Sequence, residues 1–253
     1  MKSQQTALVT GAGQRIGRAI AIDLGRAGWR VAVHYNSSSE AAGETVEQIR
    51  SNGGSAVALQ ADLEDLDAVR GLLPACAEAL APPQCLINNA SLFERDDIST
   101  LNPEDFQRHL RVNLHAPVFL AQAFAASLPA DARGVIINIL DQRVWKLTPE
   151  YFSYTLSKSA LWTATQTLAQ ALAPNVRVNA IGPGPTLANS RQSKEAFEKQ
   201  QQSTILQRGA EPEEISAAVR FILDAPSMTG QMIALDGGQH LAWRTPDIFE
   251  SKD

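Results

Sequence analysis

The sequence TALVTGAGQRIG, residues 6–17, decides the fold of this 253-residue chain. Its first five residues are apolar or β-branched and predict a buried strand. Glycines follow at positions 11, 13 and 17, and glycine lets a backbone turn sharply and approach another group closely. A helical pattern begins at Arg15, so the turn leads to a helix N-terminus, where free N–H groups favour an anion. The stretch therefore predicts a loop that binds a pyrophosphate.

Short apolar runs alternate with helical patterns along the rest of the chain. The runs are rich in Val, Ile and Leu without polar alternation, which is typical of strands covered on both faces. This alternation predicts a single α/β domain, residues 1–243, with a Rossmann-type, doubly wound parallel sheet flanked by helices. We expect strands at 6–10, 29–35, 56–60, 85–88, 134–140, 176–181 and 231–235, and helices at 15–27, 41–50, 66–80, 106–126, 154–173 and 213–224.

Two segments fall outside this alternation. Residues 185–208 are polar and show no strand pattern. We expect a mobile helical flap over a site there, because long loops in compact domains are usually functional or disordered. Residues 244–253 are also polar and predict a frayed C-terminal tail.

Composition and charge argue against several classes of protein. The net charge is −5 and no stripe of Lys and Arg is present, which disfavours a nucleic-acid or membrane partner. The N-terminus has no apolar signal core and no apolar run approaches about 18 residues, so we expect a cytoplasmic protein. No metal site is expected. The only cysteines are Cys76 and Cys85, whose context favours buried free thiols, with one disulfide as the alternative.

The end of the second predicted strand indicates which dinucleotide binds. An NAD site usually has Asp or Glu there to hold the ribose 2′-hydroxyl. This chain has Tyr35, Asn36 and Ser37 instead, and its first carboxylate is Glu40. Neutral donors favour a 2′-phosphate and hence NADP. Asp62, just after the third strand, can accept a hydrogen bond from the adenine amine or cap the next helix.

Arg15 is an unusual residue for the first turn of the helix that follows the phosphate loop. A cation near the positive end of the helix dipole is unfavourable unless an anion lies beside it. A guanidinium binds phosphate and carboxylate well. We therefore expect Arg15 to contact a phosphate, a substrate or both, with an ordinary surface arginine as the alternative.

The run LDQRVWKLTPEYFSYTLSK, residues 140–158, contains the candidate proton donor. Tyr154 and Lys158 are four residues apart, so both can lie on one helix face. A nearby ammonium lowers the pKa of a phenol, and moving that pKa from about 10 to about 7 requires roughly 4 kcal/mol. The pair predicts a general acid, although a solvated helix face shows the same spacing. Asp141, when ionised, only accepts hydrogen bonds, and so suits a substrate rich in N–H donors.

Together these features resemble the short-chain dehydrogenase/reductase family, from Thr6 to about Trp243. The resemblance implies a homotetramer and catalytic roles for Asp141, Tyr154, Lys158 and Asn113, with Asn113 anchoring a helix kink and a relay water. It implies that the NADP contacts are Gly11, Arg15, Ile16, Gly17, His34, Tyr35, Asn36, Ser37, Asp62, Leu63, Asn89, Ala90, Ser91, Lys158, Pro183, Gly184 and Thr186.

Within the family the chain is most similar to the pteridine reductases. Arg15 replaces the usual glycine, Asp141 replaces the usual serine, and residues 88–93 read NNASLF. His34-Tyr35 at the end of the second strand is similar as well, whereas Asn36-Ser37 and Gln14 lack the basic residues often found in that group. The resemblance implies that Phe93 stacks on the pterin opposite the nicotinamide and that the substrate contacts are Arg15, Ser91, Phe93, Asp141 and Tyr154.

These observations predict NADPH-dependent reduction of a pterin, from dihydropterin to tetrahydropterin and also from the oxidised pterin. A carboxylate at position 141 would repel a developing alkoxide, which disfavours simple ketone reduction. Two alternatives stay open. One is a carbonyl reductase of the same family that acts on a 3-ketoacyl thioester, sugar or small ketone. The other is a non-catalytic regulator that senses NADP or pterin.

Overall fold

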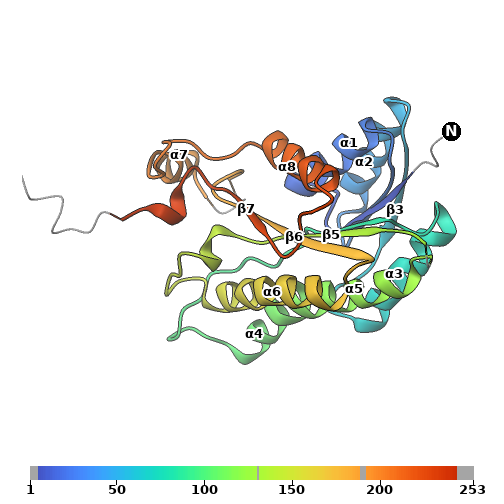
Figure 1. Ribbon diagram of the computed structural model, residues 1–253. Coiled ribbons are helices and arrows are strands. Elements are labelled where there is room, and N and C mark those ends of the chain that lie inside the picture. Colours follow the sequence, from blue (N-terminus) through green and yellow to red (C-terminus); the bar gives the residue numbers. More distant parts are fainter. Residues whose placement is uncertain (1–4, 130, 189–191, 244–253) are drawn as a thin grey trace, which may run out of the picture.

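The computed structural model describes residues 5–129, 131–188 and 192–243. Its centre is a sheet of parallel strands in the order β3-β2-β1-β4-β5-β6-β7 (Figure 1). The order reverses between β1 and β4, as in doubly wound sheets that bind a dinucleotide at this point. The strands are β1 Thr6–Val9, β2 Arg30–Tyr35, β3 Ser55–Gln60, β4 Cys85–Asn88, β5 Gly134–Ile139, β6 Val176–Pro183 and β7 Met232–Leu235.

Helices cover both faces of the sheet, so the predicted fold class is confirmed (Figure 1). One layer contains α1 Arg15–Arg26, α2 Ser39–Ser51 and α8 Pro212–Asp224. The other layer contains α3 Leu66–Ala79, α4 Pro103–Leu110, α5 Ala116–Ser127 and α6 Phe152–Ala171.

Alternating residues of the central strands form two separate cores. In β1, Ala7 and Val9 pack with α1, α2 and α8, whereas Leu8 packs with α3 and α5 on the opposite face. All three side chains are fully buried. A buried Leu or Val contributes about 1.5–3 kcal/mol, which explains why these strands are apolar without alternation.

The predicted helix at 106–126 is wrong as a single α-helix. It is divided into α4, a π-helical turn η1 at Arg111–His115, and α5. The local sequence is helical throughout, but the buried side chain of Asn113 draws the middle turn toward residues 91–92. Other boundaries moved by one to two residues; β6, for example, continues to Pro183 and α6 begins at Phe152.

The segment at 185–208 is helical in part, with α7 at Lys194–Gln202. Its mobility stays a prediction, and residues 189–191 and the predicted tail at 244–253 lie outside the described residues. Cys76 and Cys85 are buried free thiols, as expected. Burial raises the pKa of each thiol to about 12, which makes both unreactive at neutral pH.

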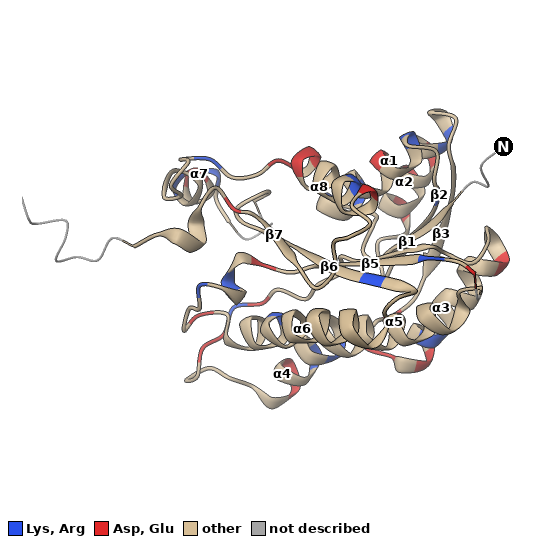
Figure 2. Cartoon of the chain, in the orientation of Figure 1, with Lys and Arg blue, Asp and Glu red and all other residues tan. Residues whose placement is uncertain are grey.

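The charged and apolar residues of the described part of the chain form neither a basic surface stripe nor a long apolar helix. Figure 2 shows acidic and basic residues interspersed over helices and loops, without a continuous basic stripe. No described helix is both long and apolar enough to cross a membrane. The described residues also contain no cluster of His, Cys, Asp and Glu that could hold a metal ion.

Candidate active site

The loops that follow β1 and β4 meet where the strand order reverses. The Asn89 side-chain amide donates to the carbonyl oxygens of Thr10 at 2.9 Å and Gly11 at 3.1 Å. The Thr10 hydroxyl accepts from the backbone N–H groups of Asn89 and Ala90 at 2.9 and 3.0 Å. These reciprocal bonds fix the two loops against each other at the carboxyl ends of the strands.

The glycine loop has the close packing that a pyrophosphate site requires. Gly11 has a φ of +62°, and a Cβ there would lie 2.9 Å from the Cα of Ala90. A Cβ on Gly17 would lie 2.3 Å from the Gly11 carbonyl oxygen. Gln14, the N-cap of α1, makes no side-chain hydrogen bond to the described part of the helix. The first-turn N–H groups therefore stay available for an anion, and these residues fit a dinucleotide.

His34 lies beneath this loop rather than at its surface. Its Nδ1 accepts from the Gly11 N–H at 3.0 Å, and its Nε2 lies 3.1 Å from the Ala61 carbonyl oxygen. These partners assign the proton to Nε2, since a carbonyl oxygen only accepts. Burial lowers the pKa of His34 to about 4. The ring is only 1% exposed, so His34 supports the phosphate loop from below.

The ends of β2 and β3 carry the other predicted dinucleotide contacts. Asn36, Ser37 and Asp62 are exposed, Tyr35 is half-buried, and the Leu63 side chain is buried. Asp62 does not cap the next helix, because Asp65 is the N-cap of α3 and accepts from the backbone of its first turn. The carboxylate of Asp62 accepts from the Glu64 N–H at 2.9 Å instead.

Asp141, Tyr154 and Arg143 form one hydrogen-bonded group at the end of β5 and the start of α6. The Tyr154 hydroxyl donates to Asp141 Oδ2 at 3.0 Å. Arg143 donates to the same oxygen through Nη1 at 3.1 Å and to Oδ1 through its backbone N–H at 2.8 Å. The Asp141 side chain is 15% exposed. The carboxylate thus faces the tyrosine rather than bulk solvent.

The environment of Tyr154 differs from the expected one. Burial and the negative charge of Asp141 raise its pKa well above the usual value, while Arg143 opposes them. A lowered pKa of Tyr154, brought about by Lys158 together with a second positive charge, stays a prediction. Lys158 Nζ donates to the Ile139 carbonyl oxygen at 2.8 Å and lies 5.8 Å from the centre of the Tyr154 ring. Burial lowers the pKa of Lys158 to about 8, against the attraction of Asp141.

Phe93 belongs to an aromatic group beside Tyr154. Its ring stacks on Tyr151 with centroids 4.5 Å apart and an interplanar angle of 4°. It also meets the Tyr154 ring edge-on at 4.7 Å. Tyr151 is the left-handed N-cap of α6, with φ of +56°. One face of Phe93 is therefore covered by Tyr151 in this state.

Asn113 connects the π-helical turn to the β4 loop. Its Oδ1 accepts from Ser91 Oγ at 3.1 Å and from the Leu92 N–H at 2.8 Å. Its Nδ2 donates to the Leu92 carbonyl oxygen at 2.9 Å and to Ser157 Oγ at 3.0 Å. Asn113 thereby holds the loop that carries Ser91 and Phe93 against the start of α6.

Arg15 contacts the segment after β6. Its guanidinium donates to the carbonyl oxygens of Leu187 at 2.8 Å and Ala188 at 2.6 Å. The neighbouring predicted contacts Pro183 and Thr186 are buried, and the Thr186 hydroxyl donates to the Gly184 carbonyl oxygen at 3.2 Å. Arg15 thus joins the phosphate loop to the beginning of the flap.

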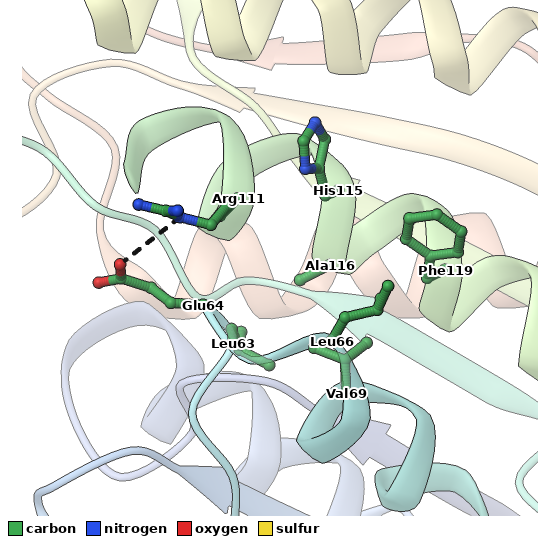
Figure 3. Close-up of a pocket in the computed structure, with 8 residues that line it drawn as sticks. All are labelled: Leu63, Glu64, Leu66, Val69, Arg111, His115, Ala116 and Phe119. Atoms are coloured by element: carbon green, nitrogen blue, oxygen red, sulfur yellow. Dashed lines mark ion pairs between the residues drawn. The ribbon is translucent and has the colours of Figure 1, made fainter. Parts of the chain in front are cut away.

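A cavity of about 120 Å³ lies outside this group, between α3 and the π-helical turn (Figure 3). Glu64 and Arg111 form an ion pair at 3.9 Å on its wall, and Leu63 lines it. It contains none of the candidate catalytic residues, so we place the chemistry at Asp141 and Tyr154 rather than in this cavity.

Similar proteins identify the family. A family model described as enoyl-(acyl carrier protein) reductase matches residues 11–240. A 3-oxoacyl-[acyl-carrier-protein] reductase from Synechocystis sp. is 33% identical over 238 residues, which cover 92% of this chain and 96% of that protein. This chain belongs to the short-chain dehydrogenase/reductase family. The resemblance noted in the sequence is thereby confirmed at the level of the family.

Solved structures of short-chain reductases include relatives with different substrates. FolM alternative dihydrofolate reductase 1 from Brucella suis, crystallised with NADP, is 51% identical, with a TM-score of 0.94 over 98% of this chain and 99% of that one. The angucycline C-6 ketoreductase LanV, with bound NADP, is 34% identical, with a TM-score of 0.87 over 94% of this chain and 96% of that one.

The structure adds site residues that the sequence did not single out. Arg143 and Tyr151 join Asp141 and Phe93, and Ser157 is a partner of Asn113. Asp96 fixes the start of α6, because its carboxylate accepts from the Ser153 N–H at 3.2 Å. Ser157 lies three residues after Tyr154 on α6, and this helical spacing was the available signal for it.

Proposed function

We propose that this short-chain reductase uses NADPH to reduce a pterin, converting a dihydropterin to a tetrahydropterin and also accepting the oxidised pterin. The observation that carries the proposal is the Asp141 carboxylate, which lies 3.0 Å from the Tyr154 hydroxyl and is directed away from bulk solvent. The 51% identity to a FolM alternative dihydrofolate reductase supports it.

The residues proposed to hold the cofactor follow the carboxyl ends of the strands. The first turn of α1 and the Gly11 loop would bind the pyrophosphate, and Lys158 would bind the nicotinamide ribose. The neutral and exposed Asn36 and Ser37 leave room for a 2′-phosphate, and the NADP in solved relatives supports this choice. When bound, NADPH supplies the hydride. The other proposed contacts are Arg15, Ile16, Gly17, Tyr35, Asp62, Leu63, Asn89, Ala90, Ser91, Pro183, Gly184 and Thr186, with His34 acting through Gly11.

The substrate pocket is proposed to bind a flat heterocycle rich in N–H donors. Asp141 would accept from the amino and ring N–H groups of the pterin, since an ionised carboxylate offers only acceptors. Phe93 would stack on the ring, which requires the substrate to occupy the face that Tyr151 leaves free or to displace Tyr151. Ser91 and Arg15 would contact both ligands.

The proposed reaction balances as dihydropterin + NADPH + H⁺ → tetrahydropterin + NADP⁺. A hydride adds to the carbon of a C=N bond, and the nitrogen takes a proton. Tyr154 would supply that proton directly or through water, and Lys158 would favour the transfer through its positive charge. Asn113 keeps Ser91 and Phe93 in place. Holding two rings in contact distance contributes much of the rate, because orientation removes an entropic barrier.

A second candidate function is carbonyl reduction by the same site. The 33% identity to a 3-oxoacyl-[acyl-carrier-protein] reductase favours it. The Asp141 carboxylate opposes it, because an alkoxide develops in ketone reduction and like charges repel. The third candidate is a non-catalytic regulator that senses NADP or pterin. The presence of Tyr154 and Lys158, both buried at the site, argues against it.

We propose that the protein forms a homotetramer and is located in the cytoplasm. The α5 sequence APVFLAQAFAAS is apolar on nearly all sides, which is typical of a helix covered all round. On α6, Leu156 is 42% exposed. A partner subunit would cover these faces.

The test is a substrate panel with purified protein. NADPH oxidation would be followed with dihydrobiopterin, dihydromonapterin and dihydrofolate, and separately with an acetoacetyl thioester. We expect turnover of at least one dihydropterin well above that of the thioester. Turnover of the thioester alone would replace the proposal with the carbonyl reductase, and NADPH binding without any turnover would support the regulator.

A further inference from the structure

Arg143 lies against the reacting end of the proposed proton donor. Its Nη1 and the Tyr154 hydroxyl share one carboxylate oxygen, Asp141 Oδ2, at 3.1 and 3.0 Å. Its backbone N–H donates to the other oxygen, Oδ1, at 2.8 Å. Two bonds from a single residue therefore fix both oxygens of the carboxylate.

The surroundings make this ion pair stronger than an ordinary surface pair. The side chains of Arg143 and Asp141 are 18% and 15% exposed, whereas those of the Arg95–Glu150 pair are 68% and 52% exposed. Water screens an exposed pair, and such pairs contribute little. A half-buried pair is screened less, and removing one partner leaves the other charge uncompensated.

The aromatic group restrains the guanidinium as well. Arg143 Cζ lies 5.1 Å from the centre of the Tyr151 ring and 5.6 Å from that of the Phe93 ring. Contacts of this kind hold a cation over or beside a ring. Arg143 consequently connects the residue proposed to bind the substrate ring, Phe93, with the residue proposed to accept its N–H groups, Asp141.

A carboxylate beside a tyrosine creates a conflict in this site. Asp141 suits a substrate with N–H donors, but its charge raises the pKa of Tyr154, which makes the phenol a poorer acid. Arg143 acts in the opposite direction on the same pKa. Arg143 reduces this conflict without removing it, because burial and the charge of Asp141 together keep the pKa of Tyr154 raised.

We propose that Arg143 is a positioning residue, which aims the Asp141 carboxylate at the substrate N–H groups and offsets its charge beside Tyr154. The site can then bind a heterocycle through a carboxylate and still deliver a proton from the neighbouring phenol. The inference rests on the proposed function for the identity of the substrate.

The test compares four variants in steady-state reduction of a dihydropterin by NADPH across pH. Arg143→Gln should lower kcat by ~10- to 100-fold, as expected for loss of a charge-assisted hydrogen bond, and should move the alkaline limb of the kcat profile to higher pH. Arg143→Lys should restore much of kcat, because it keeps the charge. Asp141→Asn should move the alkaline limb to lower pH. Arg95→Gln, the control for loss of an exposed arginine, should change neither quantity.

Two results would overturn the inference. One is an Arg143→Gln protein with kcat within about twofold of the unsubstituted protein and an unmoved alkaline limb. The other is an equal loss in Arg143→Gln and Arg143→Lys, because an electrostatic role requires the charge to matter. Thermal melts would establish that each variant is folded.

A readout that needs no turnover separates this inference from the proposed function. Phenolate absorbance, taken as the difference from Tyr154→Phe, would be compared at one alkaline pH at which every variant stays folded. Relative to the unsubstituted protein, Asp141→Asn should show more phenolate and Arg143→Gln less. If no pterin is reduced but the phenolate differences are present, the proposed substrate is rejected and the role of Arg143 is not. Equal phenolate absorbance in the three proteins would reject the role of Arg143.

Discussion

His34 illustrates how one buried side chain supports the phosphate loop. The neutral ring accepts from the Gly11 N–H through Nδ1 and donates to the Ala61 carbonyl through Nε2. Burial of the ring lowers the pKa of His34 from 6.5 to about 4. Protonation would also place an N–H of the ring against the Gly11 N–H. The unfolded chain binds this proton at about 6.5.

The depressed pKa of His34 predicts a stability that depends on pH. The contribution of the neutral ring to the free energy of unfolding is complete above about pH 6.5. About 2 to 3 kcal/mol of it is lost as the pH falls toward 4. His34→Gln should remove this part of the dependence, as measured by urea unfolding at pH 7.5, above the window, and at pH 4.5, near its lower end. The exposed His115, replaced by Gln, is the control. An identical loss of stability on acidification in the His34→Gln and unsubstituted proteins would contradict this account.

Among the elements, the π-helical turn η1 has the most direct effect on the site. Asn113 forms four hydrogen bonds, three of them to Ser91 and Leu92. Asn113→Ala would leave the half-buried N–H of Leu92 without its partner, which costs roughly 1–3 kcal/mol. It would also release the loop that carries Phe93. We expect a lower free energy of unfolding together with a higher KM for the pterin.

Asn102→Ala is the matched control for Asn113→Ala. Asn102 caps α4 by accepting from the N–H groups of Glu104 and Asp105, and loss of such a cap costs about 1 kcal/mol. It should lower stability without changing KM. Equal KM values in the Asn113→Ala and unsubstituted proteins would show that η1 does not position the loop.

Local patterns predicted most of the helices and strands because their apolar residues follow the helical period or form continuous strand runs. They did not predict η1, since its cause is a contact between Asn113 and residues 91–92, far away in the sequence. The same limit applies to the site. The Tyr154–Lys158 spacing was visible, but the hydrogen bond from Tyr154 to Asp141 depends on how β5 and α6 end side by side. Arg143 was not predicted because the sequence does not show that the turn at Gln142–Val144 directs its guanidinium to Asp141, two residues earlier.

At the scale of the whole molecule, the proposed tetramer requires the outer faces of α5 and α6 to be buried between subunits. Leu156→Glu would put a charge on a side chain that is exposed in the single chain and buried in the proposed assembly. We expect sedimentation to show a smaller particle for this variant than for the unsubstituted protein. Phe221→Glu on α8, where Phe221 is 59% exposed, is the control and should leave the assembly intact. A monomer in the unsubstituted protein would exclude the tetramer.

The family and fold are common to dihydrofolate reductases and ketoreductases among the relatives, so the substrate depends on few residues. In the proposed function, Asp141 is the residue that would separate the two chemistries, because a carboxylate offers acceptors to N–H groups and would oppose an alkoxide. The decisive measurement is therefore the kcat/KM of Asp141→Ser for a dihydropterin, with the Kd for NADPH measured on the same protein. The account predicts loss of pterin reduction by about 100-fold or more, with the Kd for NADPH unchanged; pterin reduction at the unsubstituted rate would contradict it.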